Sequence, residues 1–388
     1  MRTVYLDNNA TTRVADEVRD VMLPFLTDLY GNPSSMHTFG GQVHRDIERA
    51  REELGALIHA DPEEIVFTSC GTESDNTAIM SALLSNPDKH HIISTRVEHP
   101  AVWGLGKTLA RRGYRVTFLP VDKLGRLDLD ELRESISEDT AVVSIMYANN
   151  ESGVLFPIEK IADIVKSRGI LFHTDAVQTV GKIPVDVRSL PCDMMSFSGH
   201  KMHAAKGIGA LYIKRGTRFS PYMIGGHQER GRRAGTENVA SIAGFGKAAE
   251  LARTHIESGS SAMKHLRDRL QQGLLDACPG ARINGDPLHR IPNTLNISFE
   301  YVEGEAILLR LNEYNICASS GSACTSGSLE PSHVLRAMGV PFTAIHGSVR
   351  FSLSRYTTED DINIVLEKMP PIIKELRELS PYGRESVR

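Results

Sequence analysis

The sequence predicts an α/β protein with a mostly parallel sheet, followed by a smaller α+β unit. From about residue 60, short apolar runs alternate with amphipathic stretches, which is typical of βαβ units whose sheet is covered on both faces. After a long helical stretch, strands and helices of mixed order follow from about residue 290. These two patterns define the fold class before any motif is considered.

The elements of the large unit follow from the apolar runs and from glycines at helix ends. Apolar runs predict strands at residues 64–69, 91–96, 114–121, 140–149, 170–176, 194–201 and 208–215. Amphipathic stretches between them predict helices at 72–85, 101–113, 128–136 and 158–169. Because no helix separates the last two strands, we expect one antiparallel strand in the sheet.

The second unit follows a helical stretch over residues 237–277. The same reasoning predicts strands at 294–301 and 349–354. Helices are predicted at 305–316 and 357–379. The order of these elements differs from the regular alternation before them, so the unit is expected to be α+β.

The chain has 388 residues, above the size at which a single core usually stops growing, so two domains are expected. We place the boundary near residue 255. The large domain is predicted over residues 14–255, and the small domain over residues 1–13 together with 256–388.

The composition excludes several classes of protein. With 41% hydrophobic and 24% charged residues and a net charge of -4, the chain shows no basic excess for nucleic acid and no basic amphipathic run for a membrane surface. The first residues lack the pattern of a signal peptide, so a cytoplasmic location is expected. The 5 cysteines contain no C-x-x-C pair, which argues against a disulfide framework or a zinc ribbon.

A lysine and an aspartate stand at the ends of two predicted strands. Lys201 is the last residue of the strand predicted at 194–201, and by itself it would be interpreted as a surface lysine. Asp175 ends an otherwise apolar strand, where a carboxylate needs a cation or several hydrogen bonds. Pyridoxal phosphate needs such a pair, because a lysine forms its Schiff base and an aspartate holds its pyridine nitrogen protonated.

The turn Cys70–Gly71–Thr72 joins a predicted strand to a predicted helix. Backbone N–H groups at the helix start and the Thr72 hydroxyl would suit a phosphate, although in isolation the turn would be interpreted as an ordinary N-cap. Ser198 and His200 would add donors from the turn that carries the lysine.

Six motifs together resemble the NifS/IscS-type cysteine desulfurases of the class V aminotransferase family, nearest the nitrogen-fixation NifS branch. They are "EHPAV", "ANNESG", "HTDAVQ", "SFSGHK", "GGHQERGRRAGTEN" and "SSGSACTSGSLEPSHVLRAMG". The resemblance covers nearly the whole chain, from "YLDNNATT" to "LRELSP". It implies the pyridoxal-phosphate-dependent transferase fold of type I, with a large domain around a seven-stranded sheet, and a homodimer.

The same resemblance implies a reaction. Sulfur is removed from L-cysteine, leaving L-alanine and an enzyme persulfide that is passed on for iron–sulfur cluster assembly, here for nitrogenase. The alternatives are a housekeeping IscS-type role, or another enzyme of this fold such as a selenocysteine lyase or an aminotransferase. A third alternative is a sulfur or cluster carrier that uses a thiol without any cofactor.

The resemblance assigns roles residue by residue. Lys201 forms the Schiff base and Asp175 pairs with the pyridine nitrogen, while His99 stacks on the ring and handles thiol protons. From its position alone, His99 could equally be a capped core histidine at the end of a strand. Gln178 would hydrogen-bond the phenolic oxygen of the ring. The remaining cofactor contacts implied are Gly71, Thr72, Asn150, Ser198, Gly199, His200 and, from the other subunit, Thr236.

Arg350, helped by Asn32, would bind the substrate carboxylate, since a guanidinium matches a carboxylate with two hydrogen bonds. A structural salt bridge is the alternative for Arg350, and Arg355 is a nearby competitor for either role. Cys324 would accept the sulfur, and its persulfide could transiently ligate a cluster shared with an iron–sulfur scaffold protein. The alternative for Cys324 is a small buried thiol.

The segment 318–328, "ASSGSACTSGS", surrounds Cys324 with small residues. Gly321 and Gly327 tolerate backbone conformations that other residues avoid. We therefore predict a mobile loop that holds Cys324 away from Lys201 in the resting protein and brings it in for reaction.

Overall fold

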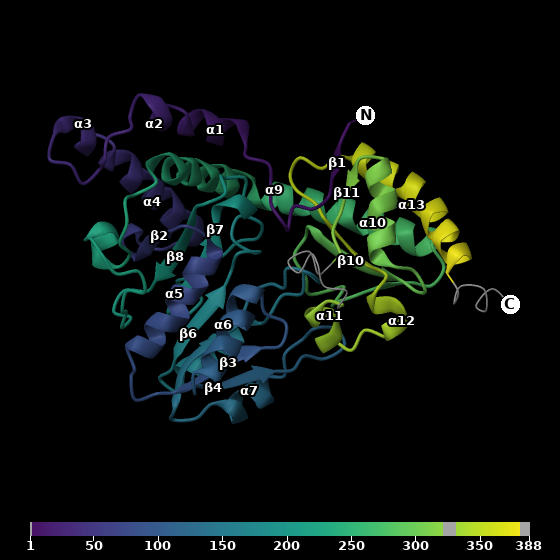
Figure 1. Ribbon diagram of the computed structural model, residues 1–388, viewed down its shortest axis with the longest axis horizontal. Coiled ribbons are helices and arrows are strands. Elements are labelled where there is room, and N and C mark those ends of the chain that lie inside the picture. The colour runs from purple at the N-terminus through teal and green to yellow at the C-terminus, as the bar shows by residue number, and fades with distance from the viewer. Residues whose placement is uncertain (1, 321–330, 381–388) are drawn as a thin grey trace.

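The computed structural model describes residues 2–320 and 331–380. Its central feature is a seven-stranded sheet, seen in the lower left of Figure 1. In spatial order the strands are β2 (Ile65–Thr68), β8 (Gly209–Ile213), β7 (Met194–Ser198), β6 (Leu171–Asp175), β5 (Thr140–Ser144), β3 (His91–Thr95) and β4 (Arg115–Leu119). Strand β8 is antiparallel to both of its neighbours, and the other pairs are parallel. The predicted mostly parallel sheet with one antiparallel strand is confirmed.

Helices cover both faces of this sheet, which explains why most of its strands are buried along their whole length. One face packs against α5 (Gly71–Leu84) and α6 (Pro100–Arg111). The other face packs against α7 (Leu129–Ser135), α8 (Ile158–Lys166) and the first half of α9 (Val239–Ala277). Each of these helices lies within one or two residues of a predicted one, or inside it.

The sequence analysis assigned no element before residue 60, and the structure places several there. They are β1 (Val4–Tyr5), α1 (Asp16–Met22), α2 (Pro24–Thr27), α3 (Thr38–Gly41) and α4 (His44–Ile58). Helices α1 and α4 pack into the same core as α9. Three short 3₁₀ turns also occur in the described part of the chain, at η1 (Pro62–Glu64), η2 (Gly199–Lys201) and η3 (Gln228–Gly231).

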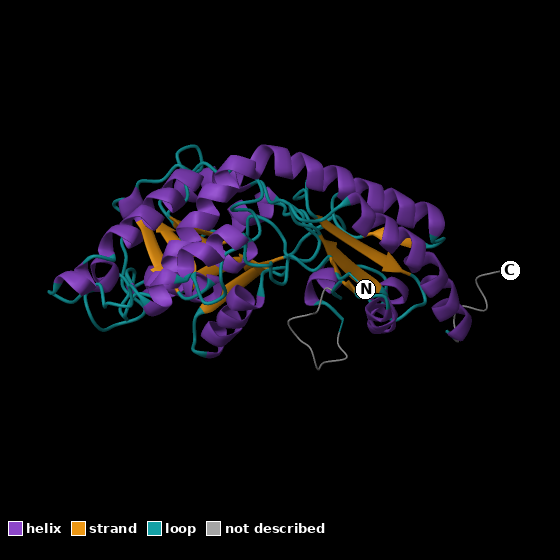
Figure 2. Ribbon diagram, turned by 90° about the horizontal axis from the view of Figure 1, so that it is seen from above, coloured by secondary structure: helices purple, strands orange, loops and turns teal. Residues whose placement is uncertain are grey.

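The smaller unit contains two small sheets, visible in Figure 2 as the orange strands apart from the main sheet. One is antiparallel, with β10 (Thr294–Phe299) between β12 (Ser348–Ser352) and β9 (Ala281–Ile283). The other pairs β1 with β11 (Ile316–Cys317) in parallel.

The helices of this unit are α10 (Gly304–Glu313), α11 (His333–Ala337), α12 (Phe342–Ile345) and α13 (Glu359–Leu379). Helices α10 and α13 share a core with the second half of α9. The helix predicted over 305–316 was too long. It ends at Glu313 because Asn315 adopts a left-handed backbone conformation with φ of 56°, and the chain then enters β11.

Helix α9 joins the two units, and Figure 1 shows it passing from teal to green between them. Its 39 residues are continuous, so the boundary predicted near residue 255 falls inside a helix. Residues from Val239 to Ala252 enter the core of the large unit, and Leu266, Leu270 and Leu274 enter that of the small unit. The domain limits therefore stay a prediction. Within the described ranges, no helix is long and apolar enough to cross a membrane.

Candidate active site

Two neighbouring strands bring the predicted lysine and aspartate to one edge of the sheet. Asp175 is the last residue of β6, and Lys201 ends the 3₁₀ turn η2 directly after β7. The strands are parallel, with Asp175 opposite Ser196, so their carboxyl ends lie together. The Nζ of Lys201 donates to the backbone oxygens of Asn9 and Ala10 at 2.5 and 2.8 Å. Ligands in open α/β sheets bind at this edge.

A cavity of about 280 Å³ lies there. Ten of the predicted residues line it, namely Gly71, Thr72, His99, Asn150, Asp175, Gln178, Ser198, His200, Lys201 and Arg350. Its wall also includes residues that the sequence analysis did not select: Asn9, Ala10, Cys70, Asp75, Met146, Ala148 and Val177. Gly199 is buried in the turn between Ser198 and His200 and does not itself line the cavity.

Asp175 lies in the buried wall of this cavity. Burial raises the pKa of its carboxyl to about 6, while an N–H bond from Val177 and the charge of Lys201 act in the opposite direction. Asp75 is also buried, and burial followed by the charge of Asp175 raises its pKa well above the usual range. Two close carboxyls resist sharing two negative charges, so a proton or a cationic ligand atom is favoured here.

One end of the cavity suits a phosphate group. It is formed by the N-terminus of α5, a helix of 14 residues that starts at Gly71. A Cβ on Gly71 would lie 2.8 Å from Cγ2 of Val177, so glycine is needed for the close approach. The Ser198 hydroxyl is buried and has no hydrogen-bond partner among the described residues. Orphan N–H groups with an unused hydroxyl favour an anion at this position.

His99 both caps a helix and lines the cavity. Its Nδ1 accepts a hydrogen bond from the backbone N–H of Ala101 at 3.2 Å, at the start of α6. Burial and the positive charges of Lys201 and His333 lower its pKa to about 4, so the ring is neutral near pH 7. Because Nδ1 accepts, the proton of the neutral ring is on Nε2. The helix-capping contact is a finding of the structure, and the stacking of His99 on a cofactor ring stays a prediction.

Arg350 lies in β12 and is almost fully buried. Its Nη2 is 2.9 Å from Oδ1 of Asp7, and its Nη1 donates to the backbone oxygen of Asn150 at 3.0 Å. The salt bridge offered as the alternative for this arginine is present, yet the side chain also lines the cavity. Its competitor Arg355 lies over the ring of Tyr356 and lines a different cavity.

Two predicted residues lie outside the cavity of this chain. Asn32 is exposed in the segment between α2 and α3, where its Oδ1 accepts from the backbone N–H of Ser34. Asn32 does not line the cavity that contains Arg350, so within one chain it is not placed to help Arg350 bind the substrate carboxylate. Thr236 is likewise exposed and does not line the cavity. The roles assigned to both residues stay predictions.

Asn9 is the main site residue that the sequence analysis missed. Its backbone oxygen accepts hydrogen bonds from both Lys201 Nζ and Gln178 Nε2. Its own side chain donates to Thr294 Oγ1 and to the backbone oxygen of Asn150. The motif "YLDNNATT" contains it, but short polar residues near a terminus give no local pattern that indicates such a role.

Cys324 and the predicted mobile loop lie outside the described residues, apart from residues 318–320 at its start. Both flanks of the segment contact the region of the cavity. Ser319 exchanges two backbone hydrogen bonds with Arg350, and His333 Nε2 is 2.9 Å from the backbone oxygen of Glu98. Within the described ranges, no group of three His, Cys, Asp or Glu side chains could hold a metal ion.

Glu98, which precedes His99, is a fully buried carboxyl. Its Oε1 accepts from the Thr95 hydroxyl and the Met146 backbone N–H, and burial raises its pKa to about 8. Between its usual pKa of 4.5 and about 8, the folded chain therefore binds a proton that the unfolded chain has released. The free energy of unfolding should fall with rising pH in this window, by up to about 1.4 kcal/mol per pH unit from this group.

Glu98→Gln should remove this dependence because glutamine does not titrate. We expect the variant to equal the unaltered chain near about pH 5 and to be more stable near about pH 8, as measured by urea unfolding of the cofactor-free protein. Glu257→Gln, at an exposed position of α9, is the matched control and should not alter the slope. An identical slope in Glu98→Gln would show that Glu98 is already ionised at neutral pH.

Fold and site together define an α/β enzyme with reactive side chains at the carboxyl edge of a parallel sheet. The chain belongs to the aminotransferase class-V family, whose model matches residues 4–365. A cysteine desulfurase from Trichormus azollae is 62% identical over 385 residues, which cover 99% of this chain and 96% of the relative. The cysteine desulfurase NifS of Azotobacter vinelandii is 58% identical over 383 residues, or 98% and 95% of the two chains.

Solved structures of similar proteins support the same family and fold. A NifS-like protein has a TM-score of 0.91 and 40% identity, covering 97% of this chain and all of its own. A NifS-like protein from Rickettsia africae has a TM-score of 0.86 and 34% identity, covering 96% of this chain and all of its own. The fold class and the resemblance inferred from the motifs are confirmed.

Proposed function

We propose that this chain is a pyridoxal-phosphate-dependent cysteine desulfurase. One observation carries the proposal: a single cavity contains Lys201, the buried Asp175 and the N-terminus of α5 with the unused Ser198 hydroxyl. These groups match the aldehyde, the ring nitrogen and the phosphate of the cofactor. Relatives named as cysteine desulfurases, at 58–62% identity over nearly the full chain, support the substrate and the reaction.

Each end of the cofactor would have its own residues. Lys201 would form the Schiff base, and Asp175 would keep the pyridine nitrogen protonated. Gly71, Thr72, Ser198 and His200 would hold the phosphate, together with the partner subunit's Thr236. When bound, the cofactor supplies a protonated ring that accepts the electrons left when a bond at Cα is broken.

The side chains of the cavity supply the other steps. Arg350 is positioned to bind the carboxylate of L-cysteine, because it lines the cavity and its buried Nε has no hydrogen-bond partner among the described residues. The Lys201 amine takes the Cα proton, and neutral His99 can accept a thiol proton. The Cys324 thiolate then attacks the substrate sulfur, the C–S bond breaks, and L-cysteine plus the thiol becomes L-alanine plus a Cys324 persulfide.

The fate of the persulfide extends the proposal. We propose a homodimer, in which Thr236 completes the site of the partner, and an iron–sulfur scaffold protein as the sulfur acceptor. Nitrogenase cluster assembly is the favoured use, since NifS of Azotobacter vinelandii is among the relatives. A cytoplasmic location fits this role.

A direct assay tests the proposed function. The purified chain, loaded with pyridoxal phosphate, should absorb in the visible range and convert L-cysteine with a reductant into equal amounts of L-alanine and sulfide. L-serine, which lacks only the sulfur, is the matched control and should give no alanine. Turnover that requires a keto acid and releases no sulfide would identify an aminotransferase and contradict the proposal.

A further inference from the structure

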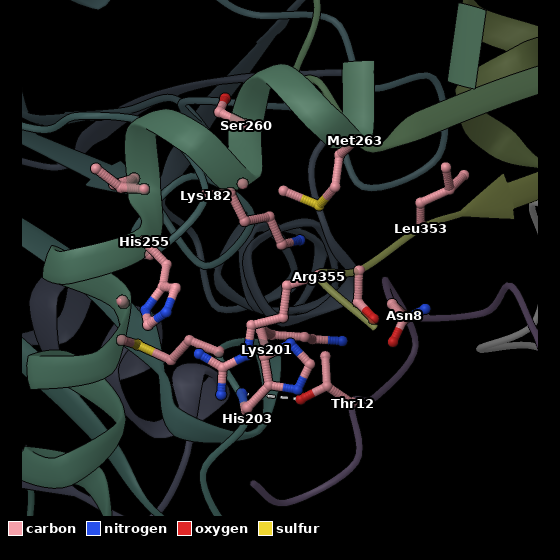
Figure 3. Close-up of a pocket in the computed structure, with 16 residues that line it drawn as sticks. Asn8, Thr12, Lys182, Lys201, His203, His255, Ser260, Met263, Leu353 and Arg355 are labelled. Carbon is pink, nitrogen blue, oxygen red and sulfur yellow. Dashed lines mark hydrogen bonds between the residues drawn. The ribbon is translucent and has the colours of Figure 1, made fainter. Parts of the chain in front are cut away.

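Lys201 also lines a second, smaller cavity of about 50 Å³, shown in Figure 3. The wall of this cavity includes Lys182, a lysine that is only 7% exposed. Lys182 belongs to the turn after β6, where backbone hydrogen bonds from Val180 to Ala176 and from Ile183 to Thr179 form helix-like steps. A buried lysine is costly unless its amine is bound, so its contacts indicate what it does.

The Lys182 amine reaches from this cavity to the wall of the cofactor cavity. Its Nζ donates to Oε1 of Gln178 at 2.6 Å and to Oδ1 of Asn9 at 3.2 Å. Both acceptors line the cofactor cavity, whereas Lys182 does not. Burial and the positive charges of Lys201 and Arg350 lower the pKa of Lys182 well below its usual range. In either protonation state the amine keeps N–H groups that can donate to both oxygens.

The contact determines how the Gln178 amide is oriented. With Oε1 held by Lys182, the NH₂ group of Gln178 points to the other side, where Nε2 donates to the backbone oxygen of Asn9 at 3.1 Å. That same oxygen accepts from Lys201 Nζ. The donor end of Gln178 therefore lies beside the amine that would react with the cofactor.

We propose that Lys182 is a positioning residue that keeps the N–H group of Gln178 directed at the phenolic oxygen of the cofactor. The inference rests on the proposed function. In pyridoxal phosphate the phenolic oxygen is attached next to the aldehyde-bearing carbon, so a donor beside Lys201 Nζ faces that oxygen. The hydrogen bond from Lys182 to Oε1 also polarises the Gln178 amide, which makes the N–H groups of that amide stronger donors.

Lys182→Met tests this, because methionine keeps the approximate length and removes the donor. We expect the variant to bind pyridoxal phosphate about fivefold more weakly than the unaltered chain, the size of one ordinary hydrogen bond. The pH midpoint of its visible absorbance should rise by about one unit. Without the hydrogen bond from Gln178, the phenolic oxygen better stabilises the proton on the Schiff-base nitrogen of Lys201. Lys214→Met, at an exposed lysine, is the charge-matched control and should match the unaltered chain.

A double-substitution cycle separates positioning from a direct charge effect. If Lys182 acts through Gln178, adding Lys182→Met to Gln178→Ala should produce no further change in the pH midpoint. The inference would be overturned if Lys182→Met shifted the pH midpoint equally with and without Gln178→Ala, or if Lys182→Met alone caused no shift. Either result would leave the proposed function intact. Absence of visible absorbance in the loaded, unaltered chain would overturn both.

Gln178→Glu gives an answer even if Lys182→Met does not fold. Glutamate keeps an oxygen for Lys182 but has no N–H group for the ring oxygen. We expect an upward shift of the midpoint at least as large as in Gln178→Ala, because a carboxylate also stabilises the proton that is lost at the midpoint. A midpoint equal to that of the unaltered chain would contradict the assigned direction of the Gln178 donor.

Discussion

Lys201→Ala should abolish both the visible absorbance of the cofactor-loaded protein and the conversion of L-cysteine, with a loss of at least about a thousandfold in kcat. The physical reason is that one amine has two tasks, since it attaches the cofactor and removes the Cα proton. The structure supports this assignment, because Lys201 lines the same cavity as Asp175 and its Nζ is held by the backbone oxygens of Asn9 and Ala10.

Two comparison variants make this prediction specific. Lys201→Arg keeps the positive charge but cannot form the Schiff base, so it should fail as Lys201→Ala does. Lys206→Ala removes an exposed lysine five positions further on and should retain full absorbance and turnover. Absorbance spectra and an alanine assay measure both properties. Retained turnover in Lys201→Ala would exclude the pyridoxal-phosphate assignment.

Cys324→Ala should bind the cofactor and L-cysteine normally, yet release neither alanine nor sulfide above about a thousandth of the unaltered rate. Without the thiol there is no nucleophile for the substrate sulfur, so the C–S bond stays intact. Ser319 and His333, on the two flanks of this segment, contact Arg350 and the backbone of Glu98. Those contacts bring the segment's ends to the region where the substrate would lie.

A neighbouring cysteine supplies the control for this variant. Cys317, seven positions earlier in β11, is a partly buried free thiol, and Cys317→Ala should leave turnover unchanged. After incubation with L-cysteine, a reductant-sensitive sulfur should be found on Cys324 by mass spectrometry of peptides. Normal desulfuration by Cys324→Ala would favour an enzyme that needs no thiol, and a protein without any bound cofactor would favour a simple sulfur carrier.

The sequence could predict a site residue only where the short stretch around that residue shows a recognisable pattern. Asp175 and Ser198 end strands whose apolar runs are visible in the sequence, and η2 then places Lys201 at the same edge. Parallel strands place their carboxyl ends together, so local pattern was enough to predict this part of the site. The turn Cys70–Gly71–Thr72 likewise lay between a predicted strand and a helix predicted to start at residue 72, one residue from the observed start of α5.

Other residues gave no local signal. Asn9 contacts Lys201 across 192 positions of sequence, and Lys182 resembles any lysine of an ordinary turn until its amine is found against Gln178. The motif around Asn32 does not reveal that its segment lies away from the cavity of its own chain, so the role of Asn32 stays a prediction. The buried state of Glu98 also depends on neighbours from several elements, including Thr95 and Met146.

The sequence by itself determined the α/β class, the antiparallel strand, and the placement of Lys201 and Asp175 at one edge of the sheet, because these depend on apolar periodicity and on residues at strand ends. The tertiary structure alone decided that the N-terminal segment carrying Asn9 closes the site, that Lys182 orients Gln178, and that Arg350 pairs with Asp7. The reason is physical. Burial and hydrogen bonds between distant segments exist only after packing, and they set the charge and direction of each side chain.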